Sequence, residues 1–294
     1  MRFKGNMRGK ESIKHRGMGA GFKRPRVELL REELMRKAKK QVALKLASRD
    51  LHVVRAAALA EDLESVFNLL AEQVLEWHAF HFPELKLLVR DPETCIKLVA
   101  QLTSRDTFSE QNILPLYANA LLAKEIACKA GESAGALLNS KEAYALKSAA
   151  KLCLSVSAQR RELGAFIESE CKELVPNLHQ LLGGMLAAKL LRAAGGLERL
   201  AFMPSSAVQV LGAEKALFAH LKEHAKPPKH GLIFQFPLVK KFPSKKRGKM
   251  ARFLAGKISI AARVDAYGKG KTLVAPTLLK QVEARAKSLS NYKG

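Results

Sequence analysis

The spacing of apolar residues along this 294-residue chain predicts a protein built from α-helices. Hydrophobic positions recur every three or four residues through most of the chain, which is the period of a helix face. Only residues 231–234 resemble a strand, and four residues are too few to build a sheet. We therefore expect an all-α protein, whose main helices cover residues 27–48, 51–80, 93–103, 140–174, 245–263 and 275–289.

Two segments carry apolar residues at spacings that alternate between three and four, the pattern of a coiled-coil seam. They span residues 109–130 and 140–174, with glycines between them. We expect them to form an antiparallel coiled-coil hairpin, although an ordinary helix pair inside a bundle fits the same pattern. The seam predicted on the second segment comprises Ala145, Ala149, Leu152, Val156, Gln159, Leu163 and Phe166. A further apolar face on residues 51–80 comprises Leu59, Leu63, Val66, Leu70, Val74 and Trp77.

Prolines, glycines and changes in charge divide the chain into five parts. Pro83 ends the second helix and Pro176 opens a new helical region, because proline is tolerated at the start of a helix and not within it. The expected parts are a flexible basic tail (1–26), basic and amphipathic leading helices (27–83), the coiled-coil hairpin (84–175), a compact helical domain (176–271) and a C-terminal helix with its tail (272–294).

The composition argues against several classes of protein. A hydrophobic content of 48% is that of a folded chain, not of a disordered one. The four cysteines are too widely spaced for a CxxC motif, so we expect free buried thiols and no disulfide or metal framework. No run of 18 uncharged apolar residues is present to span a membrane, and no apolar segment follows the basic N-terminus to make a secretory signal.

The net charge of +24 is concentrated in two segments. Residues 1–50 carry 16 basic and 5 acidic side chains, and residues 226–271 carry 13 basic and one acidic. The intervening residues, 51–225, are nearly neutral, with 18 basic and 20 acidic side chains. Such concentrated positive fields attract a polyanion, so we expect the partner to be a nucleic acid.

Sequence motifs for catalysis are weak, and we expect no enzyme, cofactor or bound metal. His220 and His224 match the H-x-x-E-H pattern of a zinc hydrolase, but acids that could complete the site are scarce in the cationic segment that follows. The Gly270-Lys271-Thr272 string resembles the end of a phosphate loop, yet Asp265 occupies the position of the loop's first glycine.

The basic helix predicted at residues 245–263 is the strongest functional signal. A solvated surface helix normally mixes both signs of charge, whereas no acid is present between Lys226 and Val264. Lysine and arginine in this setting grip the phosphate backbone rather than read bases. His230, with Phe234 and Phe236 nearby, has the chemistry to stack on an unpaired base, although core packing explains the two phenylalanines equally well.

The same region resembles the Nop-domain family, and most closely its archaeal box C/D ribonucleoprotein members. The resemblance covers about residues 30–270 in order. It rests on the segments Pro204–Phe218, Pro228–Phe234, Arg247–Arg252 and Ala261–Asp265, and on the junction from Trp77 to Leu85. It implies an all-helical fold in which a long antiparallel coiled coil pairs two protomers and carries a compact Nop domain at residues 176–271.

The resemblance also implies partners and contact residues. The Nop domain would recognise a kink-turn RNA that already holds its small ribosomal-type kink-turn-binding protein, in a complex where a separate fibrillarin subunit methylates ribose. The protein-partner surface would comprise Gly212, Ala213, Glu214, Lys215 and Phe218. Together, the resemblance and the charge pattern assign RNA contacts to Lys226, Lys229, His230, Lys245, Lys246, Arg247, Lys249, Arg252 and Lys257.

One departure from the family pattern changes the expected assembly. Family members carry a folded α/β domain before the leading helix, and that domain docks fibrillarin. About 30 basic, glycine-punctuated residues stand in its place here, which argues against direct docking of fibrillarin. The alternatives are a spliceosomal-type member of the family or a general basic RNA-binding chaperone. The expected location is the cytoplasm in an archaeon, and the nucleolus or nucleus in a eukaryote.

Overall fold

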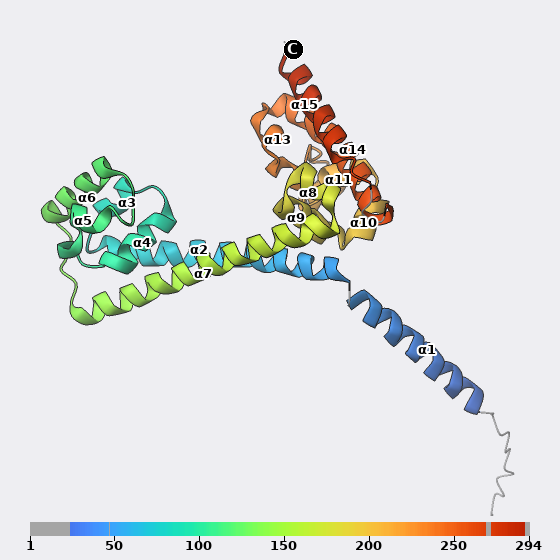
Figure 1. Ribbon diagram of the computed structural model, residues 1–294, viewed down its shortest axis with the longest axis horizontal. Helices are drawn as coiled ribbons and strands as arrows, with labels where there is room; N and C mark the ends of the chain where they lie inside the picture. The colour runs from blue at the N-terminus through green and yellow to red at the C-terminus, as the bar shows by residue number, and fades with distance from the viewer. Residues whose placement is uncertain (1–23, 47, 269–271, 292–294) are drawn as a thin grey trace, which may run out of the picture. The chain divides into compact units, whose positions relative to one another are not determined.

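The computed structural model describes residues 24–46, 48–268 and 272–291. Every regular element among these residues is an α-helix or a short 3-10 helix, so the predicted all-α class is confirmed (Figure 1). None of the helices described is long and apolar enough to cross a bilayer. The chain forms two units, residues 1–48 and 49–294.

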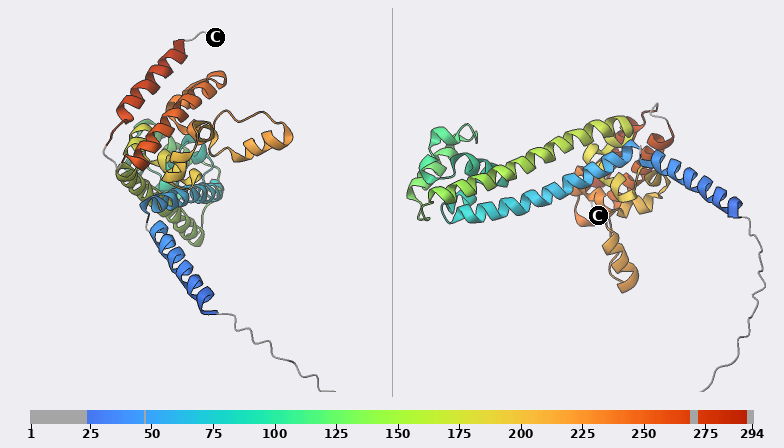
Figure 2. Two further views of the ribbon diagram at one scale, coloured as in Figure 1. Left: turned by 90° about the vertical axis from the view of Figure 1, so that its right-hand side faces the viewer. Right: turned by 90° about the horizontal axis from the view of Figure 1, so that it is seen from below.

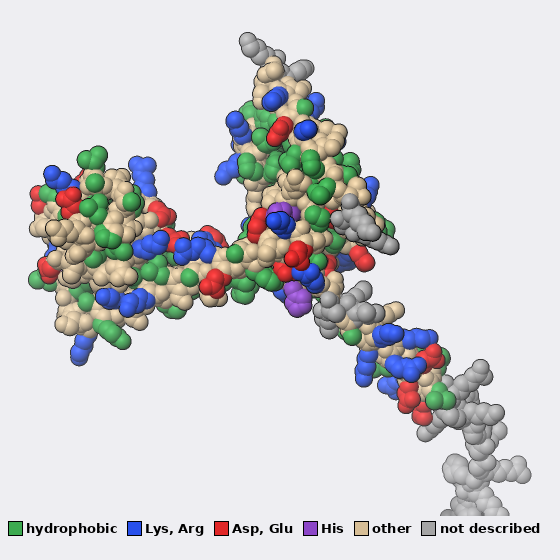
Figure 3. Space-filling model, viewed as in Figure 1, with side chains coloured by type: hydrophobic (Ala, Val, Ile, Leu, Met, Phe, Trp, Pro, Cys, Tyr) green, Lys and Arg blue, Asp and Glu red, His purple; other side chains and the backbone are tan. Residues whose placement is uncertain are grey.

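The first unit contributes one described helix, α1 (Arg24–Leu46). Its described side chains are all exposed, and lysine and arginine crowd its surface (Figure 3). A helix without a buried face gains nothing from packing, so its stability rests on helix propensity and on pairs such as Lys37–Glu33, at 2.7 Å. The basic tail predicted for residues 1–26 lies almost wholly outside the described residues.

The second unit is organised by two long antiparallel helices, α2 (Arg49–Ala79) and α7 (Ser140–Leu174), which lie side by side (Figures 1 and 2). A capping box opens α7: Asn139 Oδ1 accepts from the Glu142 N–H, and the Glu142 carboxylate accepts from the Asn139 N–H. Arg49 at the start of α2 binds Glu170 near the end of α7, with 2.8 Å between Nη2 and Oε2.

The facing sides of α2 and α7 repeat at alternating spacings of three and four, as in a coiled coil. On α2 the positions are Val53, Ala57, Ala60, Glu64, Phe67, Ala71, Val74 and His78. On α7 they are Leu146, Ala150, Cys153, Ser157, Arg160, Gly164, Ile167 and Cys171. All are buried except Glu64, Arg160 and Gly164 in the middle, where the first two form an ion pair.

An antiparallel coiled coil is therefore present, but the pairing predicted between residues 109–130 and 140–174 is wrong. Residues 109–130 hold the short helix α5 (Glu110–Ile113), a turn and most of α6 (Ala120–Glu132), while α7 pairs with α2. The predicted seam on α7 also lies one position away from the buried one. The reason is that the true seam is rich in alanine, glycine and cysteine, which pack closely but give a weaker hydrophobic signal than their larger neighbours.

A cluster of short helices covers one end of the long pair. It consists of α3 (Glu84–Leu88), α4 (Pro92–Leu102), the 3-10 helix η1 (Arg105–Thr107), α5 and α6. Buried His81, two residues after the end of α2, hydrogen-bonds to the start of η1 and to the loop before α7. Its Nε2 accepts from the Arg105 backbone N–H at 2.9 Å, so Nδ1 carries the proton and donates to Ala136 O at 2.5 Å. We call this cluster the tip.

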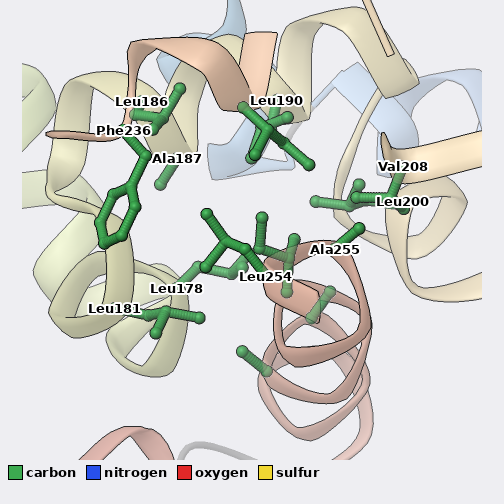
Figure 4. Packing of buried hydrophobic residues seen from close by; sticks show 14 of the residues in the cluster. Leu178, Leu181, Leu186, Ala187, Leu190, Leu200, Val208, Phe236, Leu254 and Ala255 are labelled. Atoms are coloured by element: carbon green, nitrogen blue, oxygen red, sulfur yellow. The ribbon is translucent and has the colours of Figure 1, made fainter. Parts of the chain in front are cut away.

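The remaining helices form the C-terminal module. They are α8 (Pro176–Leu182), α9 (Gly184–Ala194), α10 (Leu197–Phe202), α11 (Ser205–Val210), α12 (Glu214–Glu223), the 3-10 helix η2 (Leu232–Gln235), α13 (Pro237–Lys241), α14 (Ser244–Tyr267) and α15 (Ala275–Asn291). Its core surrounds α14: Leu254 lies against Leu178 and Leu181 of α8 and faces Leu190 of α9 (Figure 4). The strand-like residues 231–234 are largely η2, and the N–H groups of Gly231 and Leu232 bond to carbonyls at the end of α11.

A buried polar junction joins α8, α14 and α15. The Asn177 side chain donates to Asp265 Oδ1 at 2.7 Å and accepts from the Val274 N–H at 2.7 Å. Asp265 also accepts from the backbone N–H groups of Asn177 and Leu178 at the start of α8. Burial raises the pKa of Asp265. This junction places the start of α15 beside the end of α14, and the two helices contact each other.

Candidate nucleic-acid interface

A cationic pocket of about 500 Å³ opens at the first turns of α14. Five of its lining side chains are basic and none is acidic. The lining residues are Gln209, Pro227, Pro228, Lys229, Lys245, Gly248, Lys249, Arg252 and Arg285. Like charges brought this close repel one another unless an anion lies between them, so the pocket suits a ligand with several negative groups.

These five basic side chains come from three separate segments of the chain. Lys245, Lys249 and Arg252 follow one another at spacings of four and three, which places them on one face of α14. Lys229 lies on the loop after α12, and its backbone carbonyl accepts a hydrogen bond from Gln209 Nε2 at 2.7 Å. Arg285 comes from α15. Arg285 was not among the predicted contacts, since nothing local in the sequence shows that α15 returns to α14.

Beside the pocket three side chains form a stack. The His230 ring lies on the Phe234 ring, with centroids 4.8 Å apart and planes 14° from parallel, and Arg247 Cζ lies 5.1 Å from the Phe234 centroid. Arg247 Nε donates to Phe242 O at 2.6 Å. Burial and the charge of Arg247 lower the pKa of His230, so this imidazole is neutral at pH 7. Phe236 is part of the core instead.

The other predicted RNA contacts are not in the pocket lining. Lys246 Nζ donates to Leu289 O at 2.8 Å, and Lys257 Nζ donates to Gln281 Oε1 at 2.6 Å, so both lysines reach toward α15. Lys226 is exposed in the loop just before Pro227. Of the nine residues, the structure thus gathers Lys229, Lys245, Lys249 and Arg252, with His230 and Arg247 in the stack.

The predicted protein-partner surface coincides with α12 and the loop before it. None of the residues of α12 is buried, and the helix stands apart from the rest of the module in both views of Figure 2. Phe218 is 58% exposed, which is unusual for a side chain of its size. Gly212 starts this segment with a φ of +85°, where a Cβ would come within 2.5 Å of Leu232 Cγ, so only glycine fits.

The geometry at the end of α12 disfavours the alternative zinc site. His224 caps the helix in the left-handed region, with a φ of 53°, so it leaves the face that carries His220. His220 Nδ1 lies 2.5 Å from Ala225 O. No group of three potential metal ligands occurs among the residues described by the structure.

Comparison with known proteins identifies the family. The Nop family profile, described as "snoRNA binding domain, fibrillarin", matches residues 59–288. The chain belongs to the Nop family. The match begins within α2 and ends within α15, so it includes the long helix pair, the tip and the cationic pocket.

Several members of the Nop family show how much of the chain is shared. An uncharacterized NOP5 family protein of Methanocaldococcus jannaschii is 38% identical over 87% of this chain and 60% of its own length. Nucleolar protein 56 of Saccharomyces cerevisiae is 33% identical over 83% of this chain and 50% of its own. A crystal structure of a fibrillarin/Nop5p complex gives 25% identity and a TM-score of 0.49, over 90% of this chain and 78% of that one. The chain thus spans about half of the curated relatives' length.

Proposed function

We propose that this protein is a non-catalytic scaffold of a box C/D-type ribonucleoprotein, which binds a kink-turn RNA together with the small protein that recognises the kink-turn. The observation that carries the proposal is the cationic pocket, where five basic side chains from three segments meet without an acid. Five positive charges in one pocket exceed what a single small anion would neutralise, which favours a phosphate backbone as the ligand.

The RNA would bind through its phosphates at the cationic pocket and through a base at the His230–Phe234–Arg247 stack beside it. Lys245, Lys249 and Arg252 hold phosphates, and the neutral His230 presents a ring face and a hydrogen-bonding edge to a base. Because such binding releases counterions, affinity falls steeply with salt. With about five phosphate contacts, we expect a loss of about 10²- to 10³-fold between 50 and 200 mM salt.

The protein partner would bind α12. An exposed amphipathic helix that lies apart from its own module buries little within the chain, and Phe218 and Leu221 supply apolar contacts for a partner. Since α12 and the pocket are joined by the loop that carries Lys229, one composite surface of RNA and protein would contact both. In that assembly a fibrillarin subunit carries out the ribose methylation, and this chain is the scaffold that holds the RNA in position.

A second protomer would bind the exposed flank of α2 and α7. Leu59 and Val66 of α2 and Leu152 and Phe166 of α7 are large apolar residues that remain exposed, in the same heptad phase on each helix. Apolar side chains in a heptad row on a helix pair are covered in coiled coils by further helices, and an identical chain offers a matching row.

The experiment measures binding of a labelled kink-turn RNA by fluorescence anisotropy, with and without its kink-turn-binding protein, and with a scrambled RNA of equal length. We expect the protein-bound kink-turn to bind much more tightly than either RNA alone. Lys249→Glu with Arg252→Glu should weaken binding by at least about tenfold, because two phosphate contacts become repulsive. The matched control is Lys147→Glu with Lys151→Glu on α7, far from the pocket along the chain.

Three outcomes would count against the proposal. Equal affinity for the kink-turn and the scrambled RNA would favour a general RNA chaperone. An affinity that hardly changes with salt would mean that the pocket does not hold phosphates. Loss of helicity in the Lys249/Arg252 variant, measured by circular dichroism, would make those two residues structural.

A further inference from the structure

The exposed face of α14 continues well beyond the cationic pocket. An α-helix turns by about 100° per residue, so Gly256, Ile260, Arg263 and Tyr267 all fall within about 40° of the direction of Lys249. From Lys249 to Tyr267 the helix rises about 27 Å. One strip of the surface of α14 therefore begins with phosphate-binding chemistry and ends at an aromatic ring.

The far end of this strip carries two exposed aromatic rings in contact. Phe202, the last residue of α10, is 79% exposed and Tyr267 is 56% exposed. Their ring centroids lie 6.1 Å apart with the planes at 74°, so the edge of one ring meets the face of the other. Two rings that touch and still face solvent form an open corner, in which a flat apolar group can lie against one face.

Arg263 adds a cation next to this corner. Its Nε donates to Ala201 O at 3.1 Å, which holds the guanidinium beside the residue that precedes Phe202 and one turn before Tyr267. Asp265 is turned inward to the Asn177 junction. Glu198, one turn before Phe202, is exposed and offsets part of the positive charge. The corner thus suits the ring of a base better than a phosphate.

Gly256 lies between the two ends of the strip. Glycine inside a helix lowers stability relative to alanine. No atom lies within 4 Å of the place where its Cβ would stand, so packing within the chain does not require glycine there. A missing side chain lets another backbone approach the helix closely. A ligand lying along α14 could therefore come close to the helix at Gly256.

We infer that the exposed face of α14 from Lys249 to Tyr267 is a track for single-stranded RNA, and that one unpaired base stacks on the Phe202–Tyr267 corner. The inference rests on the proposed function of the cationic pocket and extends it: the structured RNA is held at the pocket, and a single-stranded extension follows the helix. Stacking on aromatic rings tolerates any base, so the track selects unpaired strands rather than a sequence.

The test compares a short RNA duplex that is blunt with the same duplex carrying a single-stranded uridine overhang. The parent protein should bind the overhang duplex about tenfold more tightly, the gain typical of stacking one base. In Phe202→Ala with Tyr267→Ala this gain should disappear while the blunt duplex binds as before. Gly256→Gln should reduce the gain as well, because its side chain would stand in the path. Phe80→Ala, which removes another exposed ring, is the control and should keep the full gain.

The outcomes separate this inference from the proposed function. If the blunt duplex binds with steep salt dependence and the overhang adds nothing, the track is wrong and the pocket stands. If the Phe202/Tyr267 variant keeps the gain and instead loses a protein partner, the corner is a protein contact and the track is wrong. If neither duplex binds, the track is wrong, whereas the proposed function is decided separately by the test with the kink-turn RNA and its binding protein.

Discussion

At the scale of single residues, buried His78 makes the tip sensitive to acid. Burial lowers the pKa of His78 from 6.5 to about 4, while its Nε2 lies 3.1 Å from Thr103 O. A folded-state pKa below the unfolded one means that the unfolded chain binds the proton more readily. The stabilisation is therefore complete above pH 6.5 and is lost as the pH falls toward 4. We expect the free energy of unfolding to fall by about 3 kcal/mol between pH 6.5 and pH 4, as measured by urea unfolding.

The variants that isolate this effect are His78→Gln and His52→Gln. The first removes the titrating group and should flatten the pH dependence, whereas the second changes an exposed histidine and should leave it unchanged. If the free energy of unfolding depends on pH equally in the parent and in His78→Gln, groups other than His78 cause that dependence. Amide exchange of α4, which ends beside Thr103, reports whether the opening is confined to the tip.

The basic residues of the pocket were largely predictable one by one. Lys245, Lys249 and Arg252 share a helix face by spacing alone, and the absence of acids around them is visible in the sequence. Arg285 was not predictable, because its position depends on the Asn177–Asp265 junction, which joins residues 88 apart. Lys246 and Lys257 look equivalent in sequence, yet the packing of α15 draws them away.

At the scale of elements, the α2–α7 pair contains a charged layer between two hydrophobic clusters. Ala60 and Ile167 belong to the cluster of the C-terminal module, and Phe67 and Cys153 belong to that of the tip. Between them Arg160 pairs with Glu64, lies 3.8 Å from Glu93 and covers the Phe67 ring. A charged pair at one seam position disfavours shifted registers, because any shift would place each charge against apolar residues.

We expect Arg160→Ala to lower the free energy of unfolding by about 1 kcal/mol, since the pair is partly open to solvent and the arginine stem also packs on Phe67. Lys151→Ala, at an exposed position on the same helix outside the apolar row, is the control and should change the free energy of unfolding by less than about 0.5 kcal/mol. Glu64→Ala combined with Arg160→Ala closes a double-mutant cycle in urea. A coupling energy of zero would mean that the two charges do not interact.

Helix boundaries were more predictable than helix pairing. The bounds predicted for 140–174 from its apolar spacing are those of α7, and Asn139 with Glu142 at its start and Pro176 after its end are local signals that agree with them. Its partner is set by contacts more than 60 residues away, at α2. The large residues that suggested a seam on α7 are real features, but the small residues beside them are the ones that α2 covers.

At the scale of the whole molecule, those large residues give the helix pair one apolar flank. In an antiparallel pair, residues that directly precede the seam positions on both helices lie on the same side. These residues include Leu59, Leu63, Val66, Leu70 and Trp77 of α2 and Ala149, Leu152, Val156, Leu163 and Phe166 of α7. Residues that directly follow seam positions are more polar and include Glu61, Glu72, Lys147 and Arg161.

A row of this length buried against a second copy would remove several large apolar side chains from water, each contributing about 1.5–3 kcal/mol when fully covered. We therefore expect the parent protein to sediment as a dimer at micromolar concentration. Leu152→Glu with Phe166→Glu should produce a monomer with unchanged helicity, because both side chains are exposed within one chain and their replacement costs the monomer little. Ala165→Glu on the polar flank should leave the dimer intact. A monomeric parent would contradict pairing through this flank, and RNA binding by the monomeric variant would show that the cationic pocket works without pairing.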